Sequence, residues 1–140
     1  MFSRTKRNKN LVIMTEQKKL QLIIEEVCKY YKQPRQMVCG HDRHREYATP
    51  RHVYCYFARE LTGCSLKEIG GALRTGYDHA SVLSAIRLIK GLVSIGVLSY
   101  EIQAVRAAVN NRILDEMNLE RHAFVTAMGS LTWSREEVAV

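Results

Sequence analysis

The chain has 140 residues, of which 46% are hydrophobic and 25% are charged, as in an ordinary globular protein with a core of its own. Its 21 Lys and Arg against 14 Asp and Glu give a formal net charge of +7, which favours a polyanionic partner, and nucleic acid over a membrane surface. A basic protein without such a partner is the plainer alternative. The apolar runs "LVIM" (11–14) and "GLVSIGVLSY" (91–100) are too short for a signal-peptide core or a membrane span, and we expect the four cysteines to be free thiols in the cytoplasm.

The first third of the chain contains one predicted helix after a polar start. The basic segment "MFSRTKRNKN" has no apolar period, and we expect residues 1–15 to form a flexible arm. From Glu16 apolar residues recur at helical spacing, and the residue before Pro34 is disfavoured in helical geometry. The predicted helix therefore ends before Pro34, and its core face consists of Leu20, Ile23, Ile24, Val27, Cys28 and Tyr31.

A polar, charged stretch then leads into a second predicted helix. "CGHDRHREYATPRHV" (39–53) has no helical period, so a loop is expected up to Thr49. Thr49 followed by Pro50 is typical of an N-cap and a first helical residue, because the N–H that proline lacks has no partner at that position. The apolar stripe of this helix consists of Val53, Tyr54, Phe57 and Leu61.

Two further helices separated by a short turn follow. Ser65 and Glu68 form a predicted capping box at the start of "LKEIGGAL" (66–73), and "RTGY" (74–77) interrupts the helical pattern. Asp78 is the predicted N-cap of the next helix, whose inner face consists of Val82, Leu83, Ile86 and Ile89. A short capped helix, a turn with glycine and a longer helix form the outline of a helix-turn-helix, in which the second helix lies in the major groove of DNA.

The last third of the chain predicts more helix. Leu98, Ile102, Val105, Val109 and Ile113 recur at the spacing of a long amphipathic helix, and a weaker helical segment covers about residues 118–128. Because no β period appears, the expected fold is all-α: a helical bundle with a helix-turn-helix and extra C-terminal helices. The expected domains are the arm (1–15), a DNA-binding domain (16–94) and a helical extension (95–140).

The start of the helix after Asp78 has two interpretations. In the plain one, Asp78 is only an N-cap. In the other, the helix end reads bases: Asp78 accepts from a cytosine amino group, His79 bonds a base acceptor, and the methyl group of Ala80 contacts a thymine methyl. Local sequence alone leaves both open.

Two chemical alternatives are weaker. Cys39, His41 and His44, with Cys28, are zinc-capable residues, but C-x-H-x-x-H matches none of the usual structural zinc spacings, and a loop with a thiol and imidazoles is the plainer interpretation. Asp78 and His79, with Ser81 or Ser84, suggest a hydrolytic triad only superficially, because adjacent helical residues point in different directions. We therefore expect no metal site and no catalytic residues.

Several motifs in the same order carry a resemblance to a known family. "ATPRHVYCYFARELTGCSLKEIGGAL" (48–73) followed by "YDHASVLSAIRLI" (77–89) resembles the C-terminal DNA-binding domain of the bacterial replication initiator DnaA. The shared features are Pro50-Arg51, "ARELT" (58–62), "SLKEIG" (65–70) and the Asp-His-small-Ser-Val run from Asp78. The resemblance covers about residues 16–94.

The resemblance implies binding to short duplex sites similar to DnaA boxes, with an arginine from the basic loop in the minor groove and the front of the recognition helix in the major groove. Such roles suit the narrow, electronegative minor groove and the anion-binding tendency of helix starts. The implied base contacts are Arg43, Lys67, Asp78, His79 and Ala80. The implied phosphate contacts are Arg45, Arg51, His52, Thr62, Ser65, Tyr77 and Ser81.

The sequence departs from the family pattern at several positions. Ala80 replaces a threonine, Tyr77 stands where a phosphate-contacting arginine is usual, and Lys67 replaces a residue that is commonly proline; these changes bear on base preference more than on binding. No G-x-x-x-x-G-K-[ST] motif is present, so we expect no nucleotide, no cofactor and no ATP switch.

The sequence thus predicts a non-enzymatic, DnaA-domain-like protein that binds specific duplex DNA in the cytoplasm, associated with the nucleoid, and regulates replication or transcription. An origin in a phage or mobile element fits the short architecture. The alternative from another class is a helical protein-interaction or assembly module that keeps the helix-turn-helix only as a scaffold. Self-association through the C-terminal helices is compatible with either.

Overall fold

The computed structural model describes residues 14–132, with side chains up to residue 128, and this part of the chain is helical with no strand. The helices are α2 (Glu16–Tyr31), α3 (Arg35–Val38), α4 (Arg45–Leu61), α5 (Leu66–Leu73), α6 (His79–Ser94) and α7 (Ser99–Thr132). The predicted all-α fold is confirmed. Of the expected arm over residues 1–15, only Met14 and Thr15 are among the described residues, and the rest lies outside them.

The chain divides into two compact units. One runs from Glu16 to Arg112, and the other includes the part of α7 from Ile113 onward. The first unit extends beyond residue 94, whereas the end of the DNA-binding domain at that residue stays a prediction. The unit extends this far because the beginning of α7 takes part in the core, through Leu98 before the helix and Ile102, Val105 and Val109 within it, all of which are buried.

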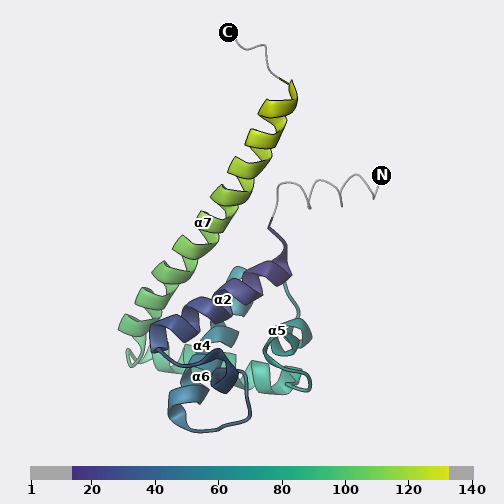
Figure 1. The fold of residues 1–140 in the computed structure, drawn as a ribbon. Coiled ribbons are helices and arrows are strands. Elements are labelled where there is room, and N and C mark those ends of the chain that lie inside the picture. The colour runs from purple at the N-terminus through teal and green to yellow at the C-terminus, as the bar shows by residue number, and fades with distance from the viewer. Residues whose placement is uncertain (1–13, 133–140) are drawn as a thin grey trace. The chain divides into compact units, whose positions relative to one another are not determined.

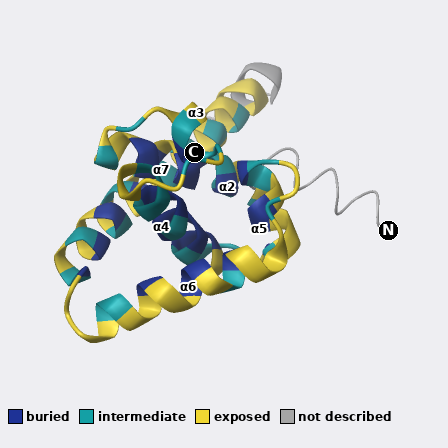
Figure 2. Ribbon diagram, turned by 90° about the horizontal axis from the view of Figure 1, so that it is seen from below, coloured by how far each residue is buried: buried dark blue, intermediate teal, exposed yellow. Residues whose placement is uncertain are grey.

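Helix α4 is the centre of the first unit, because it packs against α2, α3, α5 and α6 (Figure 1). Of its predicted apolar stripe, Val53, Tyr54 and Phe57 are fully buried, and Leu61 at the end of the helix is half-buried. The predicted core faces of α2 and α6 are also buried, except that Tyr31 and Leu83 are half-buried. Figure 2 shows the consequence for α6, which has buried residues on the side toward α4 and an exposed outer face.

Two predicted helix boundaries are wrong. Thr49 is not an N-cap, because α4 begins at Arg45 and Pro50 lies inside it. A proline in the second helical turn removes one backbone hydrogen bond, and the burial of Pro50 and of the α4 residues that follow it offsets that loss. The two C-terminal helical segments are in fact one helix, α7, of 34 residues.

No single helix among the described residues is both long and apolar enough to cross a membrane. The pair His79–Ser94 and Ser99–Met128 meets those requirements only when taken together, and it is bent by 119° at its break.

Candidate nucleic-acid interface

The N-terminal end of α6 is a capped and exposed helix start. Asp78 has extended backbone geometry, and its Oδ1 accepts a hydrogen bond from the backbone N–H of Ser81 at 2.9 Å. This hydrogen bond holds the pKa of Asp78 below its usual range, so the side chain is an anion at neutral pH. A carboxylate has about four acceptor positions, so capping through Oδ1 leaves Oδ2 able to accept from a base. The next three residues, His79, Ala80 and Ser81, are all exposed.

Close packing between α5 and the turn before α6 fixes where this helix start lies. A Cβ on Gly70 would lie 2.2 Å from the carbonyl oxygen of Tyr77, a distance that no real side chain tolerates. Glycine therefore lets the backbone before Asp78 lie directly on α5. The predicted capping box of α5 is confirmed: Glu68 N–H donates to Ser65 Oγ at 3.1 Å, and Ser65 N–H donates to Glu68 Oε1 at 2.8 Å.

A shallow cleft of about 370 Å³ lies beside the start of α6. Its lining brings together five of the residues that the sequence predicted as DNA contacts, from α4, the turn and α6: His52, Tyr77, Asp78, Ala80 and Ser81. Burial lowers the pKa of His52, and the nearby charge of Arg51 acts in the same direction. His52 is therefore a neutral imidazole at physiological pH, suited to a hydrogen bond with a phosphate oxygen and not to a charge pair.

The basic loop before α4 presents a second exposed group. Asp42 Oδ1 accepts from the backbone N–H of His44 at 2.8 Å and contacts His44 Nδ1 at 2.5 Å, so residues 42–44 form a tight turn. Arg43 lies at the tip of this turn and is exposed, as a side chain entering a groove must be. Arg45, two residues later, is exposed in the first turn of α4.

Arg51 departs from its expected role. We predicted that it faces the phosphate backbone, but only 5% of its surface is exposed. Its Nε donates to the Val38 carbonyl at 2.7 Å, and its Nη2 donates to the carbonyls of Asp42 at 2.9 Å and Met37 at 3.4 Å. A guanidinium turned inward in this way holds the loop and leaves little of its surface for a phosphate.

The remaining predicted contacts lie at two places. Lys67 and Ser65 are exposed at the N-terminal end of α5, next to Thr62, which is half-buried and whose Oγ1 donates to the Ala58 carbonyl at 2.6 Å. Tyr77 is half-buried in the turn before α6, and burial raises the pKa of its hydroxyl to about 12. Thr62 and Tyr77 thus present only part of their side chains to a ligand.

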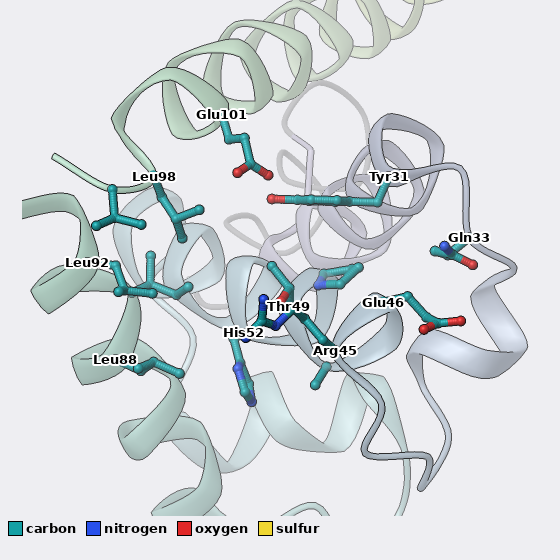
Figure 3. Close-up of a pocket in the computed structure, with 14 residues that line it drawn as sticks. Tyr31, Gln33, Arg45, Glu46, Thr49, His52, Leu88, Leu92, Leu98 and Glu101 are labelled. Carbon is teal, nitrogen blue, oxygen red and sulfur yellow. The ribbon is translucent and has the colours of Figure 1, made fainter.

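A larger cavity of about 730 Å³ lies among α2, α4, α6 and the beginning of α7. Arg45, Thr49 and His52 lie on successive turns of α4 along it, opposite Leu88 and Leu92 of α6 (Figure 3). Most of its lining is apolar, and at the far end the Glu101 carboxylate faces the Tyr31 hydroxyl (Figure 3). Of the predicted contacts, only Arg45 and His52 belong to this lining.

Among the described residues, no three His, Cys, Asp or Glu side chains gather as a metal site would require. The four cysteines are free, and burial raises the pKa of the Cys28 thiol to about 11 and that of Cys39 above its ordinary value. Both thiols are therefore protonated at neutral pH.

Sequence reasoning missed two residues that shape the interface. Gly70 was given no role from the sequence, although a glycine inside a short helix is itself a signal of close packing. Arg74 was assigned to a helix-breaking turn, but its Nη1 donates to the carbonyls of Cys39, at 3.2 Å, and Gly40. No local pattern points to that contact, because the partners lie 34 and 35 residues away in the chain.

Comparison with known proteins bears on this geometry. The family model described as the bacterial dnaA protein helix-turn-helix matches residues 20–89, half of the chain. The chain is 38% identical over 86 residues to the chromosomal replication initiator protein DnaA of Sphingopyxis alaskensis, which covers 61% of the chain and 19% of that protein. It is 42% identical over 66 residues to the DnaA protein of Thermoanaerobacter sp., a match that covers 47% of the chain and 14% of that protein. It is 36% identical over 85 residues to the DnaA protein of Rhizobium meliloti, a match that covers 60% of the chain and 18% of that protein. The chain spans less than a fifth of the length of each of these relatives. It belongs to the family of bacterial DnaA helix-turn-helix domains.

Proposed function

We propose that this chain binds specific short sites in duplex DNA, of the DnaA-box type, with the start of α6 in the major groove and Arg43 in the minor groove. The observation that carries the proposal is the exposed, capped end of α6, where Asp78, His79 and Ala80 follow one another outside the core. In a helix-turn-helix these are the positions that touch base edges. Lys67, at the start of α5, completes the proposed base contacts.

The proposed phosphate contacts surround these positions. They are the exposed residues Arg45, Ser65 and Ser81, and the half-buried residues His52, Thr62 and Tyr77. Arg51 is left out of this set because its guanidinium is buried. We place the protein in the cytoplasm on the nucleoid, as a regulator of replication or transcription without enzymatic activity or bound nucleotide, and an origin in a phage or mobile element is part of the same proposal.

A selection of bound duplexes from a random pool, at about 50 and about 200 mM salt, tests the proposal. One family of related sequences should be enriched. Because each phosphate contact releases counterions, about six contacts weaken binding roughly a thousandfold between those salt concentrations. An affinity that hardly changes with salt would contradict DNA binding and favour the interaction module. Equilibrium dialysis with labelled ATP tests the absence of nucleotide binding, which saturable uptake would contradict.

We also propose self-association through the part of α7 from Ile113 onward. Leu114, Met117 and Val125 lie on one face of this helix by its 3.6-residue period, and 58%, 38% and 58% of their surfaces are exposed. Sedimentation velocity of the full chain should show a dimer that Leu114→Glu with Val125→Glu converts to monomer. Ala123→Glu, exposed on the opposite face, is the matched control and should leave the dimer intact. A wild-type chain that is monomeric at all concentrations would contradict the proposal.

A further inference from the structure

The basic loop that carries Arg43 is held by two arginines from distant parts of the chain. Five backbone carbonyls between residues 37 and 42 accept hydrogen bonds from Arg51 or Arg74. Arg51 bonds the carbonyls of Met37, Val38 and Asp42, and Arg74 bonds those of Cys39 and Gly40. Arg51 therefore holds the end of α3 and the turn at Asp42, and Arg74 holds the backbone of the loop between them.

Arg51 supplies the anchor on the side of α4. It is a buried cation whose hydrogen bonds go to neutral carbonyls, and burial lowers its pKa below the ordinary value. Such an arrangement persists only when the guanidinium makes several well-aligned hydrogen bonds, since a buried charge without them is strongly unfavourable. The planar fork of arginine can bond several carbonyls at once, which the single ammonium of lysine does less well.

Arg74 supplies the anchor on the side of the helix-turn-helix. It occupies the C-cap position of α5, four residues before Asp78, and its backbone N–H donates to the Gly70 carbonyl at 3.2 Å. Its guanidinium lies 4.7 Å from the ring centre of Tyr77, which fixes the direction of the side chain. The same group thus touches the turn before α6 and, 34 and 35 residues earlier in the chain, the backbone of the loop.

We propose that Arg74 is a positioning residue that fastens the Arg43 loop to the helix-turn-helix turn. The inference rests on the proposed DNA binding, in which the loop and the start of α6 enter different grooves of the same duplex. A loop held in place before binding loses less conformational entropy on binding than a free one. Arg74 then acts on the minor-groove contact through the loop backbone and makes no contact with DNA itself.

Hydrogen exchange of the free protein tests the fastening without DNA. Arg74→Met keeps the apolar stem and removes the guanidinium, so amides of residues 39–44 should exchange at least about tenfold faster while those of α2 are unchanged. Arg121→Met removes the same charge from an exposed position of α7 and is the matched control. Unchanged protection of the loop would overturn the proposal. If Arg74→Met fails to fold, Arg74→Lys replaces it, with the same expected and contradicting results.

DNA binding tests the consequence, on the selected duplex with either A·T or G·C pairs flanking it on the minor-groove side. Arg74→Met should bind the A·T-flanked duplex about tenfold more weakly and lose the flank preference, as Arg43→Ala does, while preference at the bases assigned to Asp78 is kept. The double variant should bind no more weakly than Arg43→Ala alone. The proposal would be overturned if Arg74→Met lost the same affinity on both duplexes, if this loss added to that of Arg43→Ala, and if the salt dependence fell by about one phosphate contact. If no duplex binds at all, the proposed function fails, and the hydrogen-exchange arm still decides whether Arg74 fastens the loop.

Discussion

The two segments that we propose as DNA contacts, the start of α6 and the Arg43 loop, are held by different kinds of interaction. The start of α6 is fixed by residues close in sequence: Asp78 caps the helix through Ser81, and Gly70 allows close contact with Tyr77 seven residues later. The loop is fixed by Arg51 and Arg74, whose partners lie 9 to 35 residues away. The position of the start of α6 therefore depends on local contacts, and that of the Arg43 loop depends on tertiary contacts. Substitutions can disturb each of them separately.

The largest loss of stability is expected when the local contact at Gly70 is disturbed. Gly70→Ala forces its Cβ against the carbonyl of Tyr77, so the backbone must move, and the free energy of unfolding should fall by about 3 kcal/mol. Gly71→Ala is the control, since a Cβ there meets nothing within 4 Å, and it should stabilise the protein by about 1 kcal/mol through helix propensity. Urea denaturation measures both, and equal effects of the two substitutions would show that the α5–α6 packing is not as close as described.

The next largest effect concerns the tertiary anchor. Arg51→Met leaves three carbonyls, two at the end of α3 and one in the loop, without their donor, and the free energy of unfolding should fall by about 2 kcal/mol. Arg45→Met removes the same charge from an exposed position on the same helix and should change stability little. Thermal and urea unfolding of the two variants gives the comparison. If Arg51→Met left the free energy of unfolding unchanged, the loop would not be held by this side chain.

A smaller effect separates the two kinds of DNA contact. Arg43→Ala should weaken binding about tenfold, mainly on duplexes with A·T-rich flanks, because arginine favours a narrow minor groove. Arg45→Ala should weaken all sequences about equally, since a phosphate contact carries no sequence information. Fluorescence anisotropy on a panel of flanks measures both. The same loss on every flank for Arg43→Ala would remove it from the minor groove.

The smallest effect is the pH dependence of the turn at residues 42–44. The hydrogen bond to Asp42 raises the pKa of His44, and the backbone N–H of His44 lowers that of Asp42. The contribution of His44 to stability is complete below its ordinary pKa of 6.5 and is lost as the pH rises through its raised pKa in the folded protein. The contribution of Asp42 is complete above its ordinary pKa of 3.8 and is lost as the pH falls through its lowered pKa in the folded protein. An NMR titration should show the His44 pKa above 6.5 in the wild type and lower in Asp42→Asn. Identical titrations would show that the two side chains do not interact.

Local rules predicted the elements whose causes are local. The capping box of Ser65 and Glu68, the cap at Asp78 and most of the core faces of α2, α4 and α6 follow from spacing and propensity, and the structure has them. The predicted start of α4 is wrong because a Thr-Pro pair is a frequent helix start. Here α4 begins at Arg45, five residues before Pro50 and directly after the turn formed by Asp42 and His44.

Site residues with distant partners could not be predicted in this way. The sequence placed Arg51 beside Pro50 in a motif shared with the family, but its burial depends on carbonyls of residues 37–42 that only the folded chain brings near. The contact of Arg74 with the same loop has the same character. Gly70 could be predicted only in part. The sequence shows a glycine inside a short helix, but it does not show that the Tyr77 carbonyl packs against it.

The central claim is that the start of α6 reads bases, and Asp78→Asn tests it most directly. Asparagine caps a helix about as well as aspartate, so the fold and its helicity should stay as they are, with circular dichroism as the check. The side-chain amide also donates, so preference at a single base pair should relax by about tenfold or more in competition titrations against single-base variants of the selected site. His79→Ala should act at the same or the adjacent base pair and leave non-specific binding almost unchanged. Base preferences identical to the wild type in both variants would mean that Asp78 is only a cap, and would contradict the account.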